Sequence, residues 1–170
     1  MKKVLISLLL GVTLVGGLVG CGNKTTVEDK EVNTPIVEEE TLSKEDKINI
    51  LMDGISKLET NVDDQMNSMS DEYGILSNTK VNYDNLNDTI IIEHYYSYIN
   101  FSDSEMIGYF VANPGSLDVF ADMSNNDFEA IKETFGKGIP EETEIKILHK
   151  VGEYKVLEYT EGTVTYRIDK

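Results

Sequence analysis

Apolar residues recur at intervals of three and four along the segment that follows Ser43. The members of this stripe are Ile48, Leu51, Ile55, Leu58, Val62 and Met66. Because an α-helix turns once in about 3.6 residues, the spacing places them on one face of a helix. Ser43 predicts the start of this helix, since its hydroxyl can cap the first turn and Asp46 follows three residues later. The stripe suits either a sheet of the same chain or a partner helix, and the first is favoured because Gly54 interrupts a short seam.

The pattern changes to β-branched and aromatic residues in the next part of the chain. We expect a connection over residues 70–78 and then a hairpin with strands at 79–83 and 89–99. Residues 84–88, between the strands, are Asp or Asn apart from one Leu. Asp and Asn tolerate the left-handed backbone of a tight turn, which supports the hairpin.

Helical signals return after the hairpin. Ser102 and Glu105 have the spacing of a capping box and predict the start of a short helix. The Pro-Gly pair at 114–115 is expected to end it. Further helical stretches are expected from Ser116 and over residues 126–135.

The last third of the chain consists of strand-like segments separated by glycine turns. The expected strands cover 143–150, 153–159 and 163–168 and form an antiparallel meander. Helices and strands are largely segregated along the chain, which is typical of the α+β class. We therefore expect an antiparallel sheet, formed by the hairpin and the C-terminal meander, with helices packed on one face and a disordered tether before the domain.

The first twenty residues have the layout of a secretory signal. Two lysines at positions 2 and 3 precede an apolar or small run from Val4 to Gly20. This run is at the lower limit for crossing a bilayer, which takes roughly 20 predominantly apolar residues, and its internal glycines Gly11, Gly16 and Gly17 loosen it. A cleaved export signal is therefore the better interpretation of residues 1–20.

The end of this segment, Leu18-Val19-Gly20-Cys21, resembles the lipobox of bacterial lipoproteins. The resemblance implies that Cys21 is joined to a diacylglycerol and becomes the first residue of the mature chain. Cys21 is also the single cysteine, so the mature domain has no internal disulfide and acylation removes its exposed thiol. We expect a protein attached to the outer face of the cell membrane through a lipid, because two acyl chains give stable anchoring.

Residues 21–42 are polar and acidic and show no sustained apolar periodicity, which indicates a flexible tether. The remaining residues, 43–170, are enough for one domain with one core. Removal of the two signal lysines leaves 13 basic residues against 31 acidic ones, about −18 in total. Such a charge excludes nucleic acid as a partner, because nucleic-acid binding depends on neutralising phosphates with Lys and Arg.

Two internal segments carry a further resemblance. The sequences MNSMSDEY at 66–73 and TIIIEHYY at 89–96, followed by the helix and the meander, resemble a family of uncharacterised small lipoproteins in Gram-positive, clostridia-like bacteria. The resemblance covers most of residues 45–170 and is carried by pattern more than by invariant motifs. It implies a fold and a location but no activity.

Known catalytic motifs are missing from the sequence, with no nucleophile elbow, no metalloprotease helix and no phosphate-binding loop. The two histidines, His94 and His149, lie on separate predicted strands, and they could share a metal with a carboxylate only if those strands were neighbours. We favour half-buried histidines with ordinary hydrogen bonds and expect neither a cofactor nor a metal. The Asp/Asn groups at 84–88 and 118–127 do not have the spacing of a calcium loop, and turns and helix capping explain them.

Tyr95, Tyr96 and Tyr98 place aromatic rings on both faces of the long predicted strand and form the best candidate for a binding surface. The sequence thus favours a non-enzymatic, membrane-anchored accessory module that binds a cell-envelope ligand or a protein partner. The alternative is a structural or assembly role for the amphipathic helix at 44–69. A wall-polymer hydrolase is the least favoured function, because no pair of carboxylates can be singled out.

Overall fold

The computed structural model of the chain describes residues 42–168. The expected signal segment 1–20, Cys21 and the tether up to residue 41 lie outside the described residues. Within residues 42–168, no helix combines the length and the apolar character that crossing a membrane requires.

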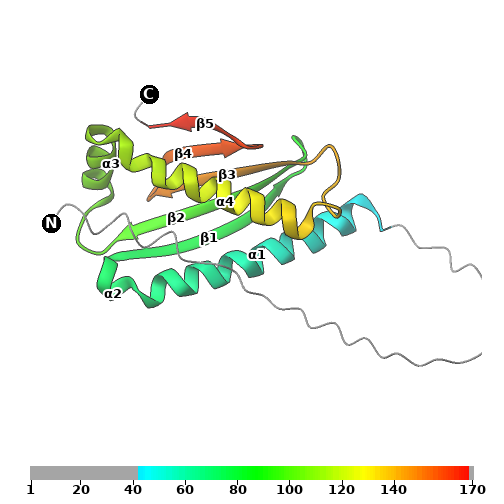
Figure 1. The fold of residues 1–170 in the computed structure, drawn as a ribbon, viewed down its shortest axis with the longest axis horizontal. Helices are drawn as coiled ribbons and strands as arrows, with labels where there is room; N and C mark the ends of the chain where they lie inside the picture. Colours follow the sequence, from blue (N-terminus) through cyan, green and yellow to red (C-terminus); the bar gives the residue numbers. More distant parts are fainter. Residues whose placement is uncertain (1–41, 169–170) are drawn as a thin grey trace, which may run out of the picture. The chain divides into compact units, whose positions relative to one another are not determined.

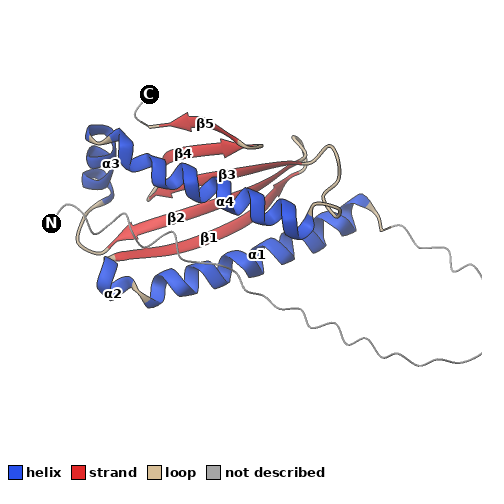
Figure 2. Ribbon diagram, viewed as in Figure 1, coloured by secondary structure: helices blue, strands red, loops and turns tan. Residues whose placement is uncertain are grey.

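Helices and strands follow one another in a simple order (Figure 1, Figure 2). They are α1 Lys44–Ser68, α2 Ser70–Tyr73, β1 Ile75–Asp84, β2 Thr89–Tyr98, α3 Asp103–Ala112, the 3-10 helix η1 Pro114–Leu117, α4 Asp118–Phe135, β3 Glu144–Val151, β4 Tyr154–Thr160 and β5 Thr163–Arg167. The long helices α1 and α4 both run along the sheet, and α3 lies near one of its ends (Figure 1).

The five strands form one sheet in the order β1-β2-β3-β4-β5. The pairs β1–β2, β3–β4 and β4–β5 are antiparallel, as expected for a hairpin and a meander. The central pair β2–β3 is parallel, so the sheet is mixed rather than purely antiparallel. The reason is the connection, because α3, η1 and α4 carry the chain back to the end where β2 began. The expected α+β class is confirmed, with helices packed on the sheet.

The core lies between the sheet and the helices. Alternate residues of the two central strands are buried, namely Ile90, Ile92, His94 and Tyr96 of β2 and Ile145, Ile147, His149 and Val151 of β3. The apolar residues Ile48, Leu51 and Ile55 of α1 pack into the same cluster. The first part of the predicted stripe is therefore buried within its own domain.

Two boundaries differ from the sequence expectation. The connection expected over residues 70–78 contains α2 and the first four residues of β1. Gly74 explains why β1 begins earlier than expected, because its positive φ of 68° ends α2 and turns the chain directly into β1. The two helical stretches expected after Ser116 are one continuous helix, α4, since the asparagines at 125–126 do not interrupt it.

Candidate functional site

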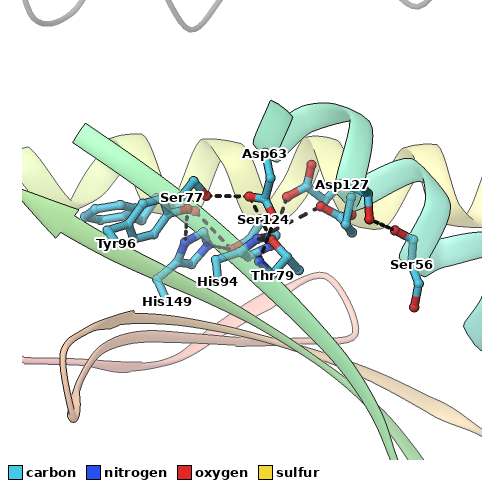
Figure 3. A network of polar contacts seen from close by, with 12 residues as sticks. Ser56, Asp63, Ser77, Thr79, His94, Tyr96, Ser124, Asp127 and His149 are labelled. Atoms are coloured by element: carbon cyan, nitrogen blue, oxygen red, sulfur yellow. Dashed lines mark hydrogen bonds and ion pairs between the residues drawn. The ribbon is translucent and has the colours of Figure 1, made fainter. Parts of the chain in front are cut away.

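The parallel pairing of β2 and β3 places His94 directly opposite His149. Their rings stack with centroids 4.9 Å apart and an angle of 23° between the planes. His94 is 4% exposed and His149 is fully buried, so the expectation of half-buried histidines is wrong. The condition that the sequence left open, that the two strands are neighbours, is met. Figure 3 shows the two rings and the polar side chains around them.

The His149 cluster, which we define as Tyr96, Ser124 and His149, has a complete set of hydrogen bonds. Ser124 Oγ donates to the carbonyl of Phe120, so it accepts from His149 Nε2–H at 2.7 Å. Tyr96 Oη lies 3.0 Å from Nδ1 and donates to it. Burial, followed by the nearby charge of His94, lowers the pKa of His149 well below its ordinary value. The ring is therefore a neutral, fully paired part of the core.

The His94 cluster, which we define as Glu59, Asp63, Thr79, His94 and Asp127, begins with a similar chain of hydrogen bonds. Thr79 Oγ1 donates to Asp63 Oδ1 at 3.1 Å, and His94 Nδ1 lies 3.0 Å from the same hydroxyl. A hydroxyl has one proton, so His94 Nδ1–H must donate to Thr79. The Asp63 carboxylate has three hydrogen-bond donors, because it also accepts from Ser77 Oγ and from the backbone N–H of Thr79.

The other nitrogen of His94 faces the Asp127 carboxylate, with which it forms an ion pair when the ring is protonated, but it makes no hydrogen bond in the described chain. His94 Nε2 lies 3.5 Å from Asp127 Oδ2, and the ring lies 4.0 Å from Glu59 Oε2, measured to Nδ1. Within the described part of the chain, neither His94 Nε2 nor Glu59 Oε2 makes a hydrogen bond, although both are buried. One ligand atom each from Glu59, His94 and Asp127 lies within 4.8 Å of the others. Two carboxylates and one imidazole nitrogen thus converge on one small volume.

The electrostatics of the His94 cluster reflect this convergence. Burial raises the pKa of Glu59 to about 7, although the charge of His94 opposes the shift. Burial also acts to lower the pKa of His94, but the adjacent Asp127 carboxylate, followed by Glu59 and Asp63, outweighs it, so the pKa of His94 is raised. Acidic groups therefore favour a positive charge at this position.

The sequence stripe of α1 missed Glu59 and Asp63. The buried residues of the helix are Ile48, Leu51, Ile55, Glu59 and Asp63, so the buried face continues from Ile55 in steps of four. The predicted stripe instead moved to Leu58 and Val62, which are only partly buried. The available signal was positional, because the residues four and eight positions after Ile55, Glu59 and Asp63, lie on its face of the helix. An apolar pattern alone overlooks charged residues that a core accommodates.

The three tyrosines of the candidate binding surface divide between the two faces of the sheet. Tyr96 is buried beside His149, and Tyr98 packs against Phe110. Tyr95 alone lies on the opposite face, where Lys80 Nζ and Lys150 Nζ lie 4.8 and 5.1 Å from the ring centroid. The three rings therefore do not form one continuous surface.

The acidic residues of the two Asp/Asn groups, at 84–88 and 118–127, make several different kinds of contact. Asp84 accepts from the backbone of Leu86 and Asn87, which is the expected use in a turn. In the second group, Asp118 pairs with Arg167, whereas Asp127 turns inward to His94. The residues of each group therefore serve different contacts rather than a shared loop.

Comparison of the chain with models of known families, with curated proteins and with solved structures finds no match. The His94 cluster is therefore the main structural indication of function.

Proposed function

We propose that this protein is a lipid-anchored lipoprotein on the outer face of the cell membrane that binds a small ligand at the His94 cluster and has no catalytic activity of its own. The observation that carries the binding role is that two of the three buried side-chain atoms without hydrogen-bond partners among residues 42–168 lie together in this cluster, Glu59 Oε2 and His94 Nε2; the third is Thr160 Oγ1. Buried polar atoms in native proteins are normally paired, with few exceptions. A ligand that completes their bonding accounts for both.

The location rests on the export pattern of residues 1–20 and on the lipobox that ends at Cys21. A lipid anchor suits a binding module because it keeps the domain at the membrane, where ligands pass between the envelope and the cell.

The burial of the His94 cluster argues for a small ligand and against a wall-polymer hydrolase. Glu59 is 4% exposed, as is His94, while the side chain of Asp127 is 23% exposed. A polymer chain cannot lie across groups that are covered in this way. An ion or a very small molecule can reach them from the side of Asp127.

The anchor is tested by substitution of Cys21. Cells expressing the full chain are labelled with a radioactive or clickable fatty acid and separated into membrane and soluble fractions. We expect label in the membrane fraction for the natural chain and none for Cys21→Ser, which should be released or remain as uncleaved precursor. Labelling of Cys21→Ser at the natural level would contradict the anchor.

The binding role is tested by a thermal-shift screen of the full chain against wall fragments, short peptides and metal ions. A ligand of the His94 cluster should raise the melting temperature of the natural chain and of Asp64→Asn, an exposed carboxylate on the same helix. It should fail to stabilise Glu59→Gln. Equal stabilisation of all three chains would contradict binding at the cluster.

A further inference from the structure

The protonation of Thr79 and His94 fixes which atoms of the cluster are available to a ligand. Because Thr79 Oγ1 gives its proton to Asp63, Nδ1 of His94 carries the hydrogen and Nε2 of a neutral ring carries a lone pair. That lone pair faces Asp127 Oδ2 at 3.5 Å. Two acceptors in this arrangement repel each other unless a cation lies between them.

Glu59 adds a third acceptor to the same volume. Its Oε2 is buried and without a hydrogen-bond partner in the described chain, and its ligand atom lies within 4.8 Å of those of His94 and Asp127. Burying a carboxylate without a partner is strongly unfavourable. A proton on Glu59, a second proton on His94 or a bound cation relieves this arrangement, and the bound cation is the one that satisfies all three groups at once.

We propose that Glu59, His94 and Asp127 bind one divalent transition-metal ion of the zinc type, with His94 Nε2 as the nitrogen ligand. The proposal rests on the proposed function in taking the His94 cluster as the ligand site, and it names the ligand.

The distances agree with such an ion. Zinc binds imidazole nitrogen and carboxylate oxygen at about 2.0–2.2 Å, so tetrahedral ligand atoms lie roughly 3.4 Å apart. The separation of 3.5 Å between His94 Nε2 and Asp127 Oδ2 is close to this value. A carboxylate oxygen of Glu59 lies within 4.8 Å of a ligand atom of each of the other two residues, so the Glu59 side chain needs to move inward by roughly 1.4 Å.

The composition of the site favours zinc over calcium or magnesium. Calcium takes six to eight oxygen ligands, and magnesium prefers oxygen ligands and retains several waters. A set of one imidazole and two carboxylates suits a borderline ion that accepts nitrogen and oxygen together. Three protein ligands also leave a coordination position for water or for a group of an outside ligand on the side of Asp127, the most exposed of the three.

Supporting residues around His94 match those that orient metal-binding histidines. Such a histidine usually donates its second N–H to a carboxylate, a carbonyl or water, which fixes the tautomer and the ring orientation. In this protein the chain runs from His94 Nδ1–H to Thr79 and on to Asp63, which three donors hold in place. The same network anchors α1 to β1, so the position of Glu59 on α1 is set by the residue four positions further along.

The helices that supply the carboxylates are held independently of an ion. Asn67, one turn beyond Asp63, exchanges two hydrogen bonds with the backbone of Ser77 on β1. Ser124, one turn before Asp127, bonds to His149 on β3. Both carboxylates therefore lie on helices that the sheet already positions, so that binding an ion requires a side-chain movement of Glu59 and no movement of a helix.

The test measures zinc binding to the full chain carrying Cys21→Ser, which removes the only thiol. Equilibrium dialysis in mild detergent and high salt suppresses weak attraction to the net charge of −16. We expect one zinc ion per chain, and at least a hundredfold weaker binding for Glu59→Gln, His94→Gln and Asp127→Asn. The matched controls Asp64→Asn and Asp122→Asn, exposed carboxylates on α1 and α4, should bind as the parent does.

Several outcomes would overturn the metal site. They are no zinc retained in high salt, zinc retained equally by Glu59→Gln, and magnesium or calcium bound as tightly as zinc at the same ionic strength. Stabilisation by a different small ligand that is lost in Glu59→Gln would also reject the metal, while it would support the proposed binding function. A failed anchor test would leave the zinc result unaffected.

A second measurement needs no variant and is therefore unaffected by misfolding. It follows the visible absorption of cobalt bound to the unsubstituted site. Cobalt in a four- or five-coordinate site with nitrogen and oxygen ligands absorbs visible light strongly, and zinc should remove this absorption at one equivalent. A spectrum that stays that of aqueous cobalt would contradict the proposal.

Discussion

His149 and His94 occupy equivalent positions on adjacent strands, stack on each other and are both buried, yet their surroundings differ. Both nitrogens of His149 have hydroxyl partners, whereas Nε2 of His94 lies 3.5 Å from Asp127 without a hydrogen bond and Glu59 lies 4.0 Å from the same ring. Burial alone therefore does not distinguish a structural histidine from a ligand-binding one. The two histidines differ in their hydrogen bonds. In the His149 cluster every donor has an acceptor, whereas the His94 cluster has more acceptors than donors.

The largest effect on stability should come from removing His149, whose two ring nitrogens both have hydrogen-bond partners. His149→Ala deletes a fully buried ring and leaves Tyr96 Oη without its acceptor, so we expect a loss of about 3 kcal/mol in the free energy of unfolding. Urea denaturation measures this loss. The zinc affinity of the folded fraction should be nearly unchanged. A tenfold or greater fall in affinity would mean that the two clusters act as one site.

The hydroxyls that hold the two rings offer a sharper comparison. Thr79→Val removes the acceptor of His94 Nδ1–H at almost constant volume, and supporting residues of this kind typically change metal affinity 10–100-fold. Ser124→Ala removes the corresponding hydroxyl of His149 and should leave zinc affinity within about twofold, because that ring binds no metal. Competition with a chelating dye measures both variants. Equal losses would remove the distinction between the rings.

The smallest expected effect is a gain in stability rather than a loss. Glu59→Gln replaces a buried carboxylate by an amide that can donate to the crowded acceptors, so the metal-free chain should be more stable by about 1 kcal/mol. Asp63→Asn, the matched change in a carboxylate with three donors, should be destabilising. Thermal and urea melts in a chelator provide the comparison. A destabilised Glu59→Gln would indicate that Glu59 has a structural role instead.

Local patterns predicted most of the fold. The cap at Ser43, the capping box at Ser102 and the hairpin around residues 84–88 correspond to observed features. Each depends on neighbouring residues, which a single sequence displays directly. The parallel pairing of β2 with β3 was not predicted, because it depends on where a helical connection of more than forty residues returns the chain.

The candidate site was predicted only in part for the same reason. The sequence identified His94 and His149 and the condition under which they would meet, and it placed Asp127 in an acidic group on the correct helix. It could not bring Glu59 to His94, since the two residues lie 35 positions apart and are joined through the packing of α1 on β1. Periodicity reports which face of a helix is apolar, but not where that face turns acidic and remains buried.

The central claim is that one histidine of the pair binds a metal and the other does not. Nuclear magnetic resonance of the full chain with ¹⁵N-labelled histidine tests it directly, because the chain has two histidines and each contributes one pair of ring nitrogens. On addition of one equivalent of zinc, we predict that Nε2 of His94 shifts to a metal-bound value, while Nδ1 of His94 remains protonated and both nitrogens of His149 keep the pattern of a neutral ring. A spectrum in which His94 still carries protons on both nitrogens after zinc is added would contradict the metal site.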